Sequence, residues 1–317
     1  MEISTTDVAG IDVSKAHLDA ALHGQDARLR VANTQAGCAR LATWLSHFGV
    51  SRVGMEASGG YERLPVDELR KAGFEVALLQ PRQVRAFAVY RLKWAKNDQI
   101  DAALIARCTA ELDTVQAPRD ARLAAMDEHL RLIEQIEADL SRQKTRSEAY
   151  RDRRLKRWIT QEVARLERRL KAEIALLMAT IARHQDLISR LRLIQTVEGV
   201  GERTALTLLI LMPELGQLSR EQAASLAGLA PFDDDTGMQR GHRHIAGGRF
   251  RVRRAIYAAA LAASFRWNPR LINLYQRLRA KGKSHKQALV ACARKLLIFV
   301  NAVVARGSAW QKQLNDA

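Results

Sequence analysis

Four carboxylates stand out as residues that could do chemistry. Asp12 and Glu56 each follow a short apolar run, and Asp98 and Asp101 are three residues apart, which places both on one face of a helix. Four clustered acids repel one another and raise each other's pKa unless cations neutralise them. Two Mg²⁺ ions about 3.5–4 Å apart can do so and can clamp the oxygens of an in-line phosphoryl displacement. The four acids therefore predict a phosphoryl-transfer site that holds two Mg²⁺ ions, or Mn²⁺ in their place.

Each acid alone has a simpler interpretation. An Asp at a strand end is more often a turn or cap residue, and Asp98 is suited to cap a helix N-terminus. The order Asp, Glu, Asp-x-x-Asp becomes informative only when it falls on a suitable succession of strands and helices.

The first hundred residues supply such a succession. Hydrophobic periodicity predicts strands at 8–11, 18–22, 28–32, 52–56 and 75–79, and helices at 35–48, 64–72, 82–90 and 98–112. The order β-β-β-α-β-α-β-α predicts a mixed central sheet covered by helices. Asp12 and Glu56 would then lie at strand ends, where ligands gather in α/β sheets.

The middle of the chain has a different pattern. The 80 residues from 119 to 198 contain neither Gly nor Pro, and Leu, Ile and Ala recur at three- and four-residue intervals. This pattern predicts one or two long helices in a hairpin or coiled coil, interrupted by the Arg-rich segment 151–157. Such an arm would pair protomers or pack on nucleic acid, although a monomeric hairpin has the same pattern.

The charge of the chain is concentrated near its C-terminus. The 317 residues include 51 Lys and Arg against 34 Asp and Glu, a formal net charge of +17. From Thr236 to Asn315 there are 17 basic residues and no acidic one, so the remainder of the chain is neutral. This asymmetry predicts a phosphate-binding surface rather than a merely solvated face. Its candidate contacts are Arg240, Arg243, Arg249, Arg251, Arg253 and Arg254.

Two local motifs in this half have both a functional and a structural interpretation. Gly199 and Gly201 flank a turn that opens a helix, which suits phosphate binding as in a helix-hairpin-helix element, or simply a glycine helix cap. Thr236 and Gly237 precede the arginines, so the hydroxyl could attack phosphorus beside stabilising guanidinium groups. From the residues alone, an ordinary turn is the simpler interpretation of Thr236.

Several classes of protein are excluded. Hydrophobic residues make up 47% of the chain, enough for real cores. The three cysteines, Cys38, Cys108 and Cys292, are scattered and predict neither a disulfide framework nor a zinc site. No apolar run approaches the roughly 20 residues of a membrane span, and the N-terminus lacks a secretory signal. We expect a cytoplasmic protein with a polyanionic partner and no membrane contact.

Taken together, the motifs resemble those of the DEDD-type insertion-sequence transposases, a group that includes bridge-RNA-guided recombinases and Piv-type DNA invertases. The matching N-terminal stretches are Gly10–Lys15, Met55–Gly59 and Lys96–Ala102, and the C-terminal ones are Val197–Gly201, Leu226–Pro231, Thr236–Gly237, Arg240–Gly241 and Arg253–Tyr257. The resemblance covers nearly the whole chain.

The resemblance implies three regions. Residues 1–115 would form an α/β RNase H-like (RuvC-like) catalytic domain, in which Asp12, Glu56, Asp98 and Asp101 match the family's metal-binding tetrad. Residues 116–190 would form a helical coiled coil. Residues 191–317 would form a basic, mostly helical transposase domain with a helix-hairpin-helix-like element. The family members cut and rejoin DNA, and the guided ones bind a structured noncoding RNA from their own element. We also expect a homo-oligomer, a dimer or, for a four-strand exchange, a tetramer, with contacts supplied by the long central helices.

One position departs from the family pattern. The family's C-terminal domain supplies a serine that holds DNA covalently, and the matching residue in this chain is Thr236. Threonine keeps the hydroxyl, but its extra methyl hinders the oxygen and restricts χ1. We expect a loss of about one or two kcal/mol in the barrier, roughly 5–30-fold in rate.

Two other functions fit part of this pattern. A RuvC-like metal-dependent nuclease, such as a junction resolvase, would need only the acidic tetrad. A catalytically inactive descendant of a transposase would bind nucleic acid in a salt-dependent manner without forming a covalent adduct.

Overall fold

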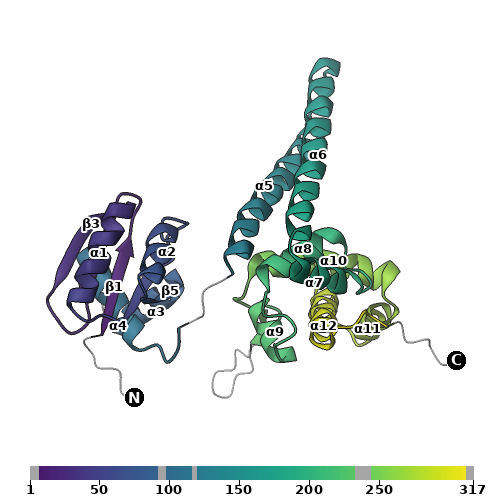
Figure 1. Cartoon of the computed structure of the whole chain (residues 1–317). Coiled ribbons are helices and arrows are strands. Elements are labelled where there is room, and N and C mark those ends of the chain that lie inside the picture. The colour runs from purple at the N-terminus through teal and green to yellow at the C-terminus, as the bar shows by residue number, and fades with distance from the viewer. Residues whose placement is uncertain (1–6, 92–97, 116–119, 233–243, 312–317) are drawn as a thin grey trace. The chain divides into compact units, whose positions relative to one another are not determined.

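The chain divides into two compact units, Met1–Pro118 and Arg119–Ala317 (Figure 1). The computed structural model describes residues 7–91, 98–115, 120–232 and 244–311, and for residues 98–101 and 232 it describes the backbone alone. The long helices expected at 116–190 therefore belong to the same unit as the C-terminal region.

A five-stranded mixed sheet forms the centre of the first unit. Its order is β3-β2-β1-β4-β5, with antiparallel pairs among the first three strands and parallel pairs from β1 to β4 and from β4 to β5. The strands are β1 (Val8–Val13), β2 (His17–Leu22), β3 (Arg28–Ala32), β4 (Arg52–Glu56) and β5 (Glu75–Leu79). The predicted mixed α/β fold is confirmed, and it is compatible with an RNase H-like domain.

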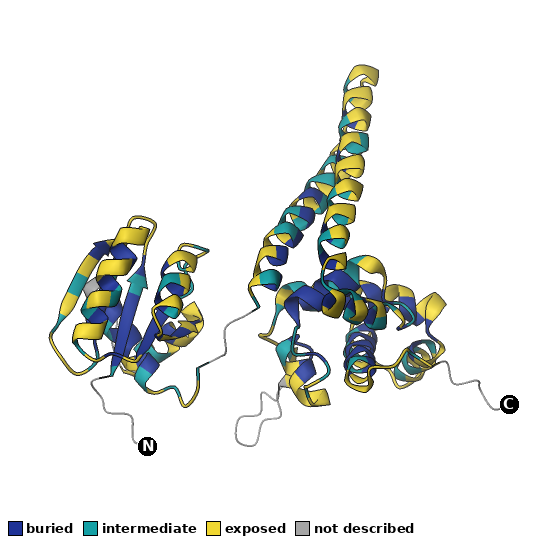
Figure 2. Cartoon of the chain, viewed as in Figure 1, coloured by how far each residue is buried: buried dark blue, intermediate teal, exposed yellow. Residues whose placement is uncertain are grey.

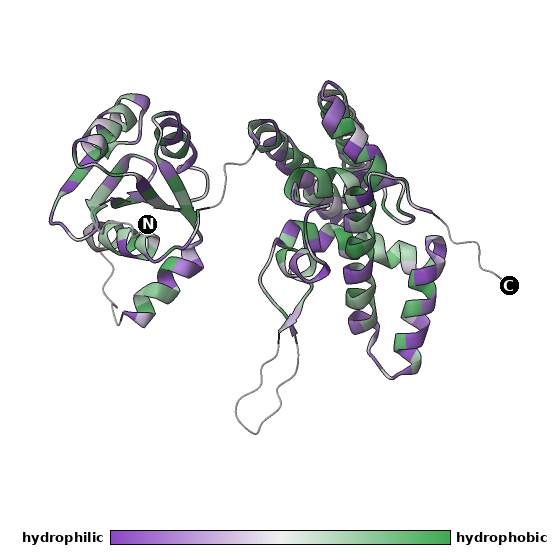
Figure 3. Cartoon of the chain, turned by 60° about the horizontal axis from the view of Figure 1, so that its bottom comes forward, coloured by the Kyte–Doolittle hydropathy of each residue, from purple (hydrophilic) through white to green (hydrophobic). Residues whose placement is uncertain are grey.

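Helices cover both faces of this sheet (Figure 3). Apolar residues on one face pack against Leu41 and Leu45 of one helix and Val66 and Leu69 of the next. A later helix packs across β1, β2 and β4 on the opposite face. The helices are α1 (Gln35–His47), α2 (Arg63–Lys71), α3 (Pro81–Tyr90) and α4 (Asp98–Ala110). All four match predicted helices to within two residues at each end.

Two long helices form an arm in the second unit, α5 (Ala121–Ala149) and α6 (Arg153–Ala182). The break between them falls inside the predicted Arg-rich interruption. Tyr150 is extended, and a carboxylate oxygen of Asp152 accepts a hydrogen bond from the Leu155 amide at 2.9 Å, which caps α6. The two helices pack against each other as a hairpin, whereas a coiled coil stays a prediction. Figure 2 shows that the outer half of the arm is mostly exposed.

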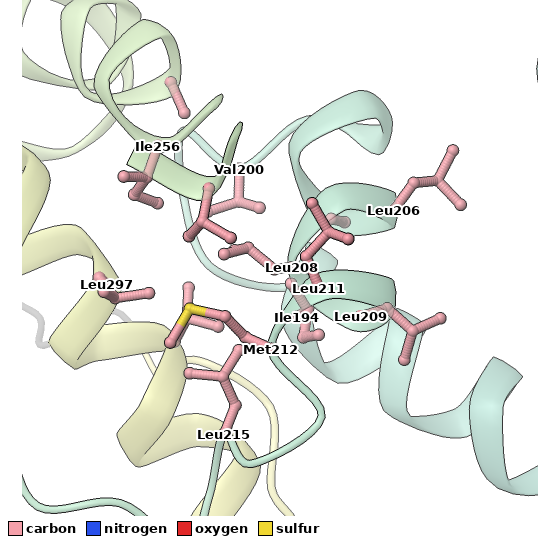
Figure 4. Packing of buried hydrophobic residues seen from close by; sticks show 14 of the residues in the cluster. Ile194, Val200, Leu206, Leu208, Leu209, Leu211, Met212, Leu215, Ile256 and Leu297 are labelled. Atoms are coloured by element: carbon pink, nitrogen blue, oxygen red, sulfur yellow. The ribbon is translucent and has the colours of Figure 1, made fainter. Parts of the chain in front are cut away.

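The base of the arm packs on the remaining helices, as expected for a mostly helical C-terminal region. The elements are α7 (Gln185–Gln195), α8 (Glu202–Leu211), α9 (Arg220–Leu226), β6 (Pro231–Phe232), β7 (His244–Ile245), α10 (Phe250–Ala262), the π-helix η1 (Ala263–Trp267), α11 (Pro269–Ala280) and α12 (His285–Arg306). Side chains from α7, α8, α10 and α12 meet in one core (Figure 4). The same core also contains Leu130 and Ile133 of α5 and Leu177 of α6.

Helix α12 is the most apolar long helix of this core. Within the described part of the chain it is the one helix long and apolar enough to cross a membrane, and 56% of its most apolar window is buried inside the structure. Leu296, Leu297 and Val300 are fully buried there. Burial in the core therefore accounts for the composition of α12.

Candidate active site

Asp12 and Glu56 lie on neighbouring parallel strands at the same edge of the sheet. Ile11 of β1 pairs with Met55 of β4, and Asp12 and Glu56 are the next residues along the two strands. Because side chains alternate along a strand and neighbouring pairs share a face, both carboxylates project from one face of the sheet. Both residues are half-buried. The first two predicted acids are therefore neighbours at the carboxyl ends of their strands.

Two glycines let α4 lie directly on this face. A Cβ added at Gly10 would fall 2.1 Å from the amide nitrogen of Ala106 and 2.3 Å from the carbonyl oxygen of Ala102. A Cβ added at Gly54 would fall 1.7 Å from the hydroxyl oxygen of Thr109. Each glycine precedes a predicted acid by two residues, so α4 covers the face from which the two carboxylates project.

Helix α4 runs opposite in direction to β1 and β4. Thr109 lies against Gly54, and three residues later the carbonyl oxygen of Leu112 accepts a hydrogen bond from Nη1 of Arg52 at 2.8 Å. Arg52 precedes Gly54 on β4, so the helix moves toward the amino end of the strand as it advances. The first turn of α4 consequently lies at the carboxyl ends of β1 and β4.

That first turn contains Asp98 and Asp101. Going back along α4 from Ala102 to Asp98 covers about 6 Å, and β1 advances about 6.6 Å from Gly10 to Asp12. The backbone of both helical acids therefore lies at the sheet edge that carries Asp12. Their side chains are outside the described residues, so the four-carboxylate site stays a prediction.

A fifth acid, which the sequence reasoning missed, lies beside Asp12. Asp19 of β2 is its cross-strand partner on the same face of the sheet. Arg30 of β3 donates two hydrogen bonds to the Asp19 carboxylate, from Nε at 2.6 Å and from Nη2 at 2.9 Å. Like charges directly opposite destabilise a strand pair, and this guanidinium offsets that repulsion. Only the strand register reveals that Asp19 and Asp12 are neighbours.

Glu62 shapes the loop that follows Glu56. Its Oε2 accepts hydrogen bonds from the amides of Ser58 at 3.1 Å and Gly60 at 2.7 Å, and from the Ser58 hydroxyl at 3.2 Å. Burial raises the pKa of Glu62, but these hydrogen bonds outweigh burial and hold the pKa below its ordinary value. Glu62 is therefore a structural carboxylate that fixes the loop beside the predicted site.

The donor chemistry at this edge suits a hard divalent cation. Carboxylate oxygens are the ligands that Mg²⁺ and Mn²⁺ prefer. Among the side chains that the structure describes, His, Cys, Asp and Glu form no group of three or more that could hold a metal ion. A metal site made by the two strand acids together with the two acids at the start of α4 stays a prediction.

The predicted nucleophile belongs to the segment 233–243, which is outside the described residues. Thr236, Arg240 and Arg243 all fall within it. The described residues on either side of the segment are tied together, because β6 and β7 pair antiparallel with Phe232 opposite His244. The segment therefore begins and ends at a fixed base.

Arg253 of α10 joins the two backbone segments at the base of the 233–243 segment. Its Nη1 donates to the carbonyl oxygens of Gly247 at 2.7 Å and Gly228 at 3.2 Å. The two backbones touch here, since a Cβ added at Gly248 would fall 2.1 Å from the amide nitrogen of Gly228. Arg253, predicted as a nucleic-acid contact, thus has a structural role at the base of the Thr236 segment.

Three other predicted contacts on or beside α10 have carboxylate partners within the protein. Arg249 forms two hydrogen bonds to Glu214, at 2.7 and 2.6 Å. Arg251 donates to Glu134 of α5 at 2.7 Å, and Arg254 lies 3.5 Å from the same carboxylate. The pairs with Glu134 join α10 to α5, and the pair with Glu214 joins the start of α10 to the segment after α8. Nucleic-acid contact at these arginines stays a prediction.

Asp127 of α5 completes this ion-pair network. It is 6% exposed and accepts hydrogen bonds from Arg251 and from Arg131, the latter at 3.0 Å. Burial raises the pKa of Asp127, but the two arginines outweigh burial and hold the pKa below its ordinary value. The carboxylate is therefore charged and paired inside the unit.

The glycine turn between α7 and α8 also has a packing role. Gly199 has φ +94° and lies against η1, where a Cβ would fall 2.3 Å from the Cβ of Ala263. Gly201 precedes α8 as its N-cap residue, and a Cβ there would meet nothing within 4 Å. Close packing thus accounts for Gly199, whereas phosphate binding at Gly199 and Gly201 stays a prediction.

Comparison with known proteins identifies the class of molecule. Residues 9–153 match a family model described as a transposase, and residues 191–276 match one described as the IS116/IS110/IS902 transposase family. The chain is 26% identical to the pilin gene-inverting proteins of Moraxella lacunata and Moraxella bovis, over 97% of this chain and 98% of each relative. It is 31% identical to an uncharacterised insertion element IS110 protein of Streptomyces coelicolor, over 38% of this chain and 30% of that relative.

The two family models cover most of the chain and fall on both units. The N-terminal match includes all four predicted acids, and the C-terminal match includes the segment that contains Thr236. The chain therefore belongs to the IS110 family of transposases and DNA recombinases.

Proposed function

We propose that this protein cuts and rejoins DNA strands by a metal-assisted phosphoryl transfer that mobilises or inverts a DNA segment. One observation carries the proposal: Asp12 and Glu56 are neighbours on the sheet face covered by α4, and the first turn of α4 brings the backbone of Asp98 and Asp101 to the same edge. Inversion is the activity in the name of the two relatives that match nearly the full length.

The four acids would hold one or two divalent ions, Mg²⁺ or Mn²⁺. When bound, such ions neutralise the phosphate and stabilise the oxygens that attack and leave. The chain's own residues set the geometry. The strand register fixes Asp12 beside Glu56, and the absence of side chains at Gly10 and Gly54 allows α4 to approach the strands. Asp19, the cross-strand neighbour of Asp12, is paired with Arg30, which offsets the repulsion between the two carboxylates.

Thr236 is the nucleophile that we propose. Its hydroxyl oxygen forms a bond to phosphorus and loses its proton to a base, while the bond from phosphorus to one deoxyribose oxygen breaks. That oxygen takes up a proton and leaves as a free hydroxyl. Attack by a hydroxyl of another strand then reverses the step, releases Thr236 and joins the strands. The paired β6 and β7 and the contacts of Arg253 support this role, because they fix both ends of the segment that contains Thr236.

Three further features belong to the proposal. A structured RNA from the flank of the protein's own gene would select the DNA by base pairing, which leaves backbone and shape contacts to the protein. A dimer or tetramer would assemble the strands that are exchanged, with the α5–α6 arm as the contact between protomers. The reaction would take place in the cytoplasm. Sequencing the RNA that co-purifies with the protein tests the guide, and a purely random set of cellular transcripts would contradict it.

The acids and the hydroxyl are tested in one strand-transfer assay with Mg²⁺ and DNA from the flanks of the gene. We expect Asp12→Ala and Glu56→Ala to lower the yield at least about a hundredfold, since each removes a carboxylate that would hold the metal ions. Asp26→Ala is the matched control, because its side chain is 93% exposed in the β2–β3 loop. Equal losses in Asp26→Ala and Asp12→Ala would contradict a specific role for the strand acids.

The same assay separates a recombinase from a simple nuclease. Thr236→Ala should abolish both strand transfer and the covalent protein–DNA adduct seen after denaturing electrophoresis. Thr236→Ser should keep both, with a rate about 5–30-fold higher than that of the natural chain, because the hindering methyl is gone. Undiminished transfer by Thr236→Ala would remove the nucleophile from the proposal. Cutting by Thr236→Ala without joining would identify a metal-dependent nuclease.

A further inference from the structure

The cations of α11 and α12 differ from those of α10 in their partners. No Asp or Glu occurs between Thr236 and Asn315. Arg277 of α11 and Lys295 of α12 are exposed, and among the residues that the structure describes no carboxylate lies within ion-pairing distance of either. Their charge is therefore balanced by solvent ions, which a polyanion would displace.

These cations line a groove between the two helices. Its volume is about 390 Å³, and it is lined by Arg270, Asn273, Leu274, Arg277, Lys295 and Phe299. The α11 members recur at three- and four-residue intervals and so lie along one helix face, and Lys295 and Phe299 are four residues apart on α12. The groove thus combines three cationic groups and one amide with an apolar floor.

Aromatic rings hold two of the cations in place. The Arg270 guanidinium carbon lies 4.9 Å from the ring centre of Trp310 and 5.8 Å from that of Phe299. Lys295 Nζ lies 5.3 Å from the Phe299 ring centre on the other side of the groove. The two rings are themselves 4.8 Å apart and form one platform. For Lys295, the cation–π contact orients the charge but does not neutralise it, whereas a carboxylate partner would.

We propose that the groove between α11 and α12 binds the sugar–phosphate backbone of DNA. Arg270 and Arg277 are seven residues apart, about 10 Å along the helix, which suits contacts with neighbouring phosphates of one strand. The apolar side chains of Leu274 and Phe299 can pack against deoxyribose, which lacks the polar 2′-hydroxyl of ribose. The inference rests on the proposed function in one respect, namely that DNA is the substrate.

The test measures binding without catalysis. Full-length protein in EDTA is titrated with a 30-base-pair DNA duplex at several KCl concentrations, and the Arg277→Gln/Lys295→Gln double variant is compared with the natural chain. We expect the slope of log affinity against log salt to become shallower by about 2, since each lost phosphate contact removes roughly one unit. The control is Arg40→Gln/Lys71→Gln, which removes the same formal charge from exposed positions on α1 and α2.

Protection of lysines gives a second readout that does not depend on a variant. Acetylation of the natural chain, followed by mass spectrometry, should show that duplex DNA shields Lys295 more than Lys71. An unchanged salt slope in the groove variant, equal losses in both double variants, or protection of Lys295 by RNA but not by DNA would overturn the proposal.

The two proposals fail in different ways. If the natural chain binds DNA through the groove but never transfers strands with Mg²⁺, the proposed function is wrong and the groove assignment remains. If strands are transferred while the groove variant binds DNA with an unaltered salt slope, only the groove assignment is wrong.

Discussion

Two basic regions of the second unit contrast in how their charge is used. Arg249 and Arg251, on and beside α10, are paired with Glu214 and with Glu134 and Asp127. Arg277 and Lys295, in the α11–α12 groove, have no carboxylate partner among the described residues, and Lys295 lies over an aromatic ring. The first region joins helices, and the second presents positive charge to solvent.

The contrast shows why a count of charges does not locate a nucleic-acid surface. The acids that neutralise the α10 arginines lie on α5 and after α8, at sequence separations of up to 124 residues. A segment that contains no acid can therefore still be neutralised by distant ones. Removing an α10 ion pair should reduce folding stability, whereas removing a groove cation should reduce DNA binding alone.

The largest effect that we expect from breaking an ion pair is that of Asp127→Ala. The substitution leaves the half-buried Arg251 with Glu134 as its remaining carboxylate, so we expect a loss of about 3 kcal/mol, the low end of the range for breaking a buried pair. Urea unfolding followed by circular dichroism measures the loss. DNA binding of the folded fraction at low urea should be unchanged.

Asp139→Ala is the matched control on the same helix. Asp139 is paired with Arg142 three residues later, but both side chains are about half exposed, so the loss should be at most about 1 kcal/mol. Equal losses at Asp127 and Asp139 would show that the α10 network contributes no more than a surface pair. Ion pairing at α10 would then contribute too little free energy to distinguish this region from the α11–α12 groove.

The N-terminal fold was largely predictable because its signals are local. Each strand is a short run rich in apolar residues between turn residues, and the five strands and four helices match prediction to within two residues at most ends. The position of α4 was not predictable. It depends on backbone contact at Gly10 and Gly54, and no periodicity reveals which helix packs on which glycine. Likewise, the neighbour of Asp12 on β2 follows from strand register alone.

The roles of residues in the C-terminal half were less predictable for the same physical reason. The sequence shows that Arg251 is basic but not that Glu134, more than a hundred residues earlier, lies beside it. Gly199 fits a phosphate-binding turn as well as it fits packing on Ala263, and only the structure shows the packing contact. The sequence gives the charge and type of each residue, whereas tertiary packing determines which residues contact one another.

Gly228→Ala should lower the free energy of unfolding by less than Asp127→Ala and by more than Asp139→Ala. Gly228→Ala puts a Cβ 2.3 Å from the carbonyl oxygen of Gly247 and forces φ +67° on an alanine. The steric conflict pushes apart the backbones that Arg253 fastens, and we expect a loss of about 2–3 kcal/mol with reduced strand transfer. Unfolding in urea and the strand-transfer assay measure the two effects.

Gly282→Ala isolates the backbone strain from the steric conflict. Gly282 lies in the α11–α12 turn at φ +76°, but a Cβ there would meet nothing within 4 Å. Its loss should therefore be limited to about 1 kcal/mol of strain. If both variants lose the same stability, the contact between Gly228 and Gly247 does not hold the base of the Thr236 segment.

The smallest effect concerns the dependence of stability on pH. Because the folded-state pKa of Asp127 lies below its ordinary value of 3.8, its contribution is present in full above that value and is lost as the pH falls through the folded-state pKa. The difference in unfolding free energy between the natural chain and Asp127→Asn should thus be constant near pH 5 and shrink below about pH 4. Other carboxylates titrate in both proteins and cancel in this difference. A difference that stays constant down to pH 3 would mean that the charge of Asp127 does not hold α5 to α10. The α10 arginines would then differ from the groove cations in their packing and not in the energy of their ion pairs.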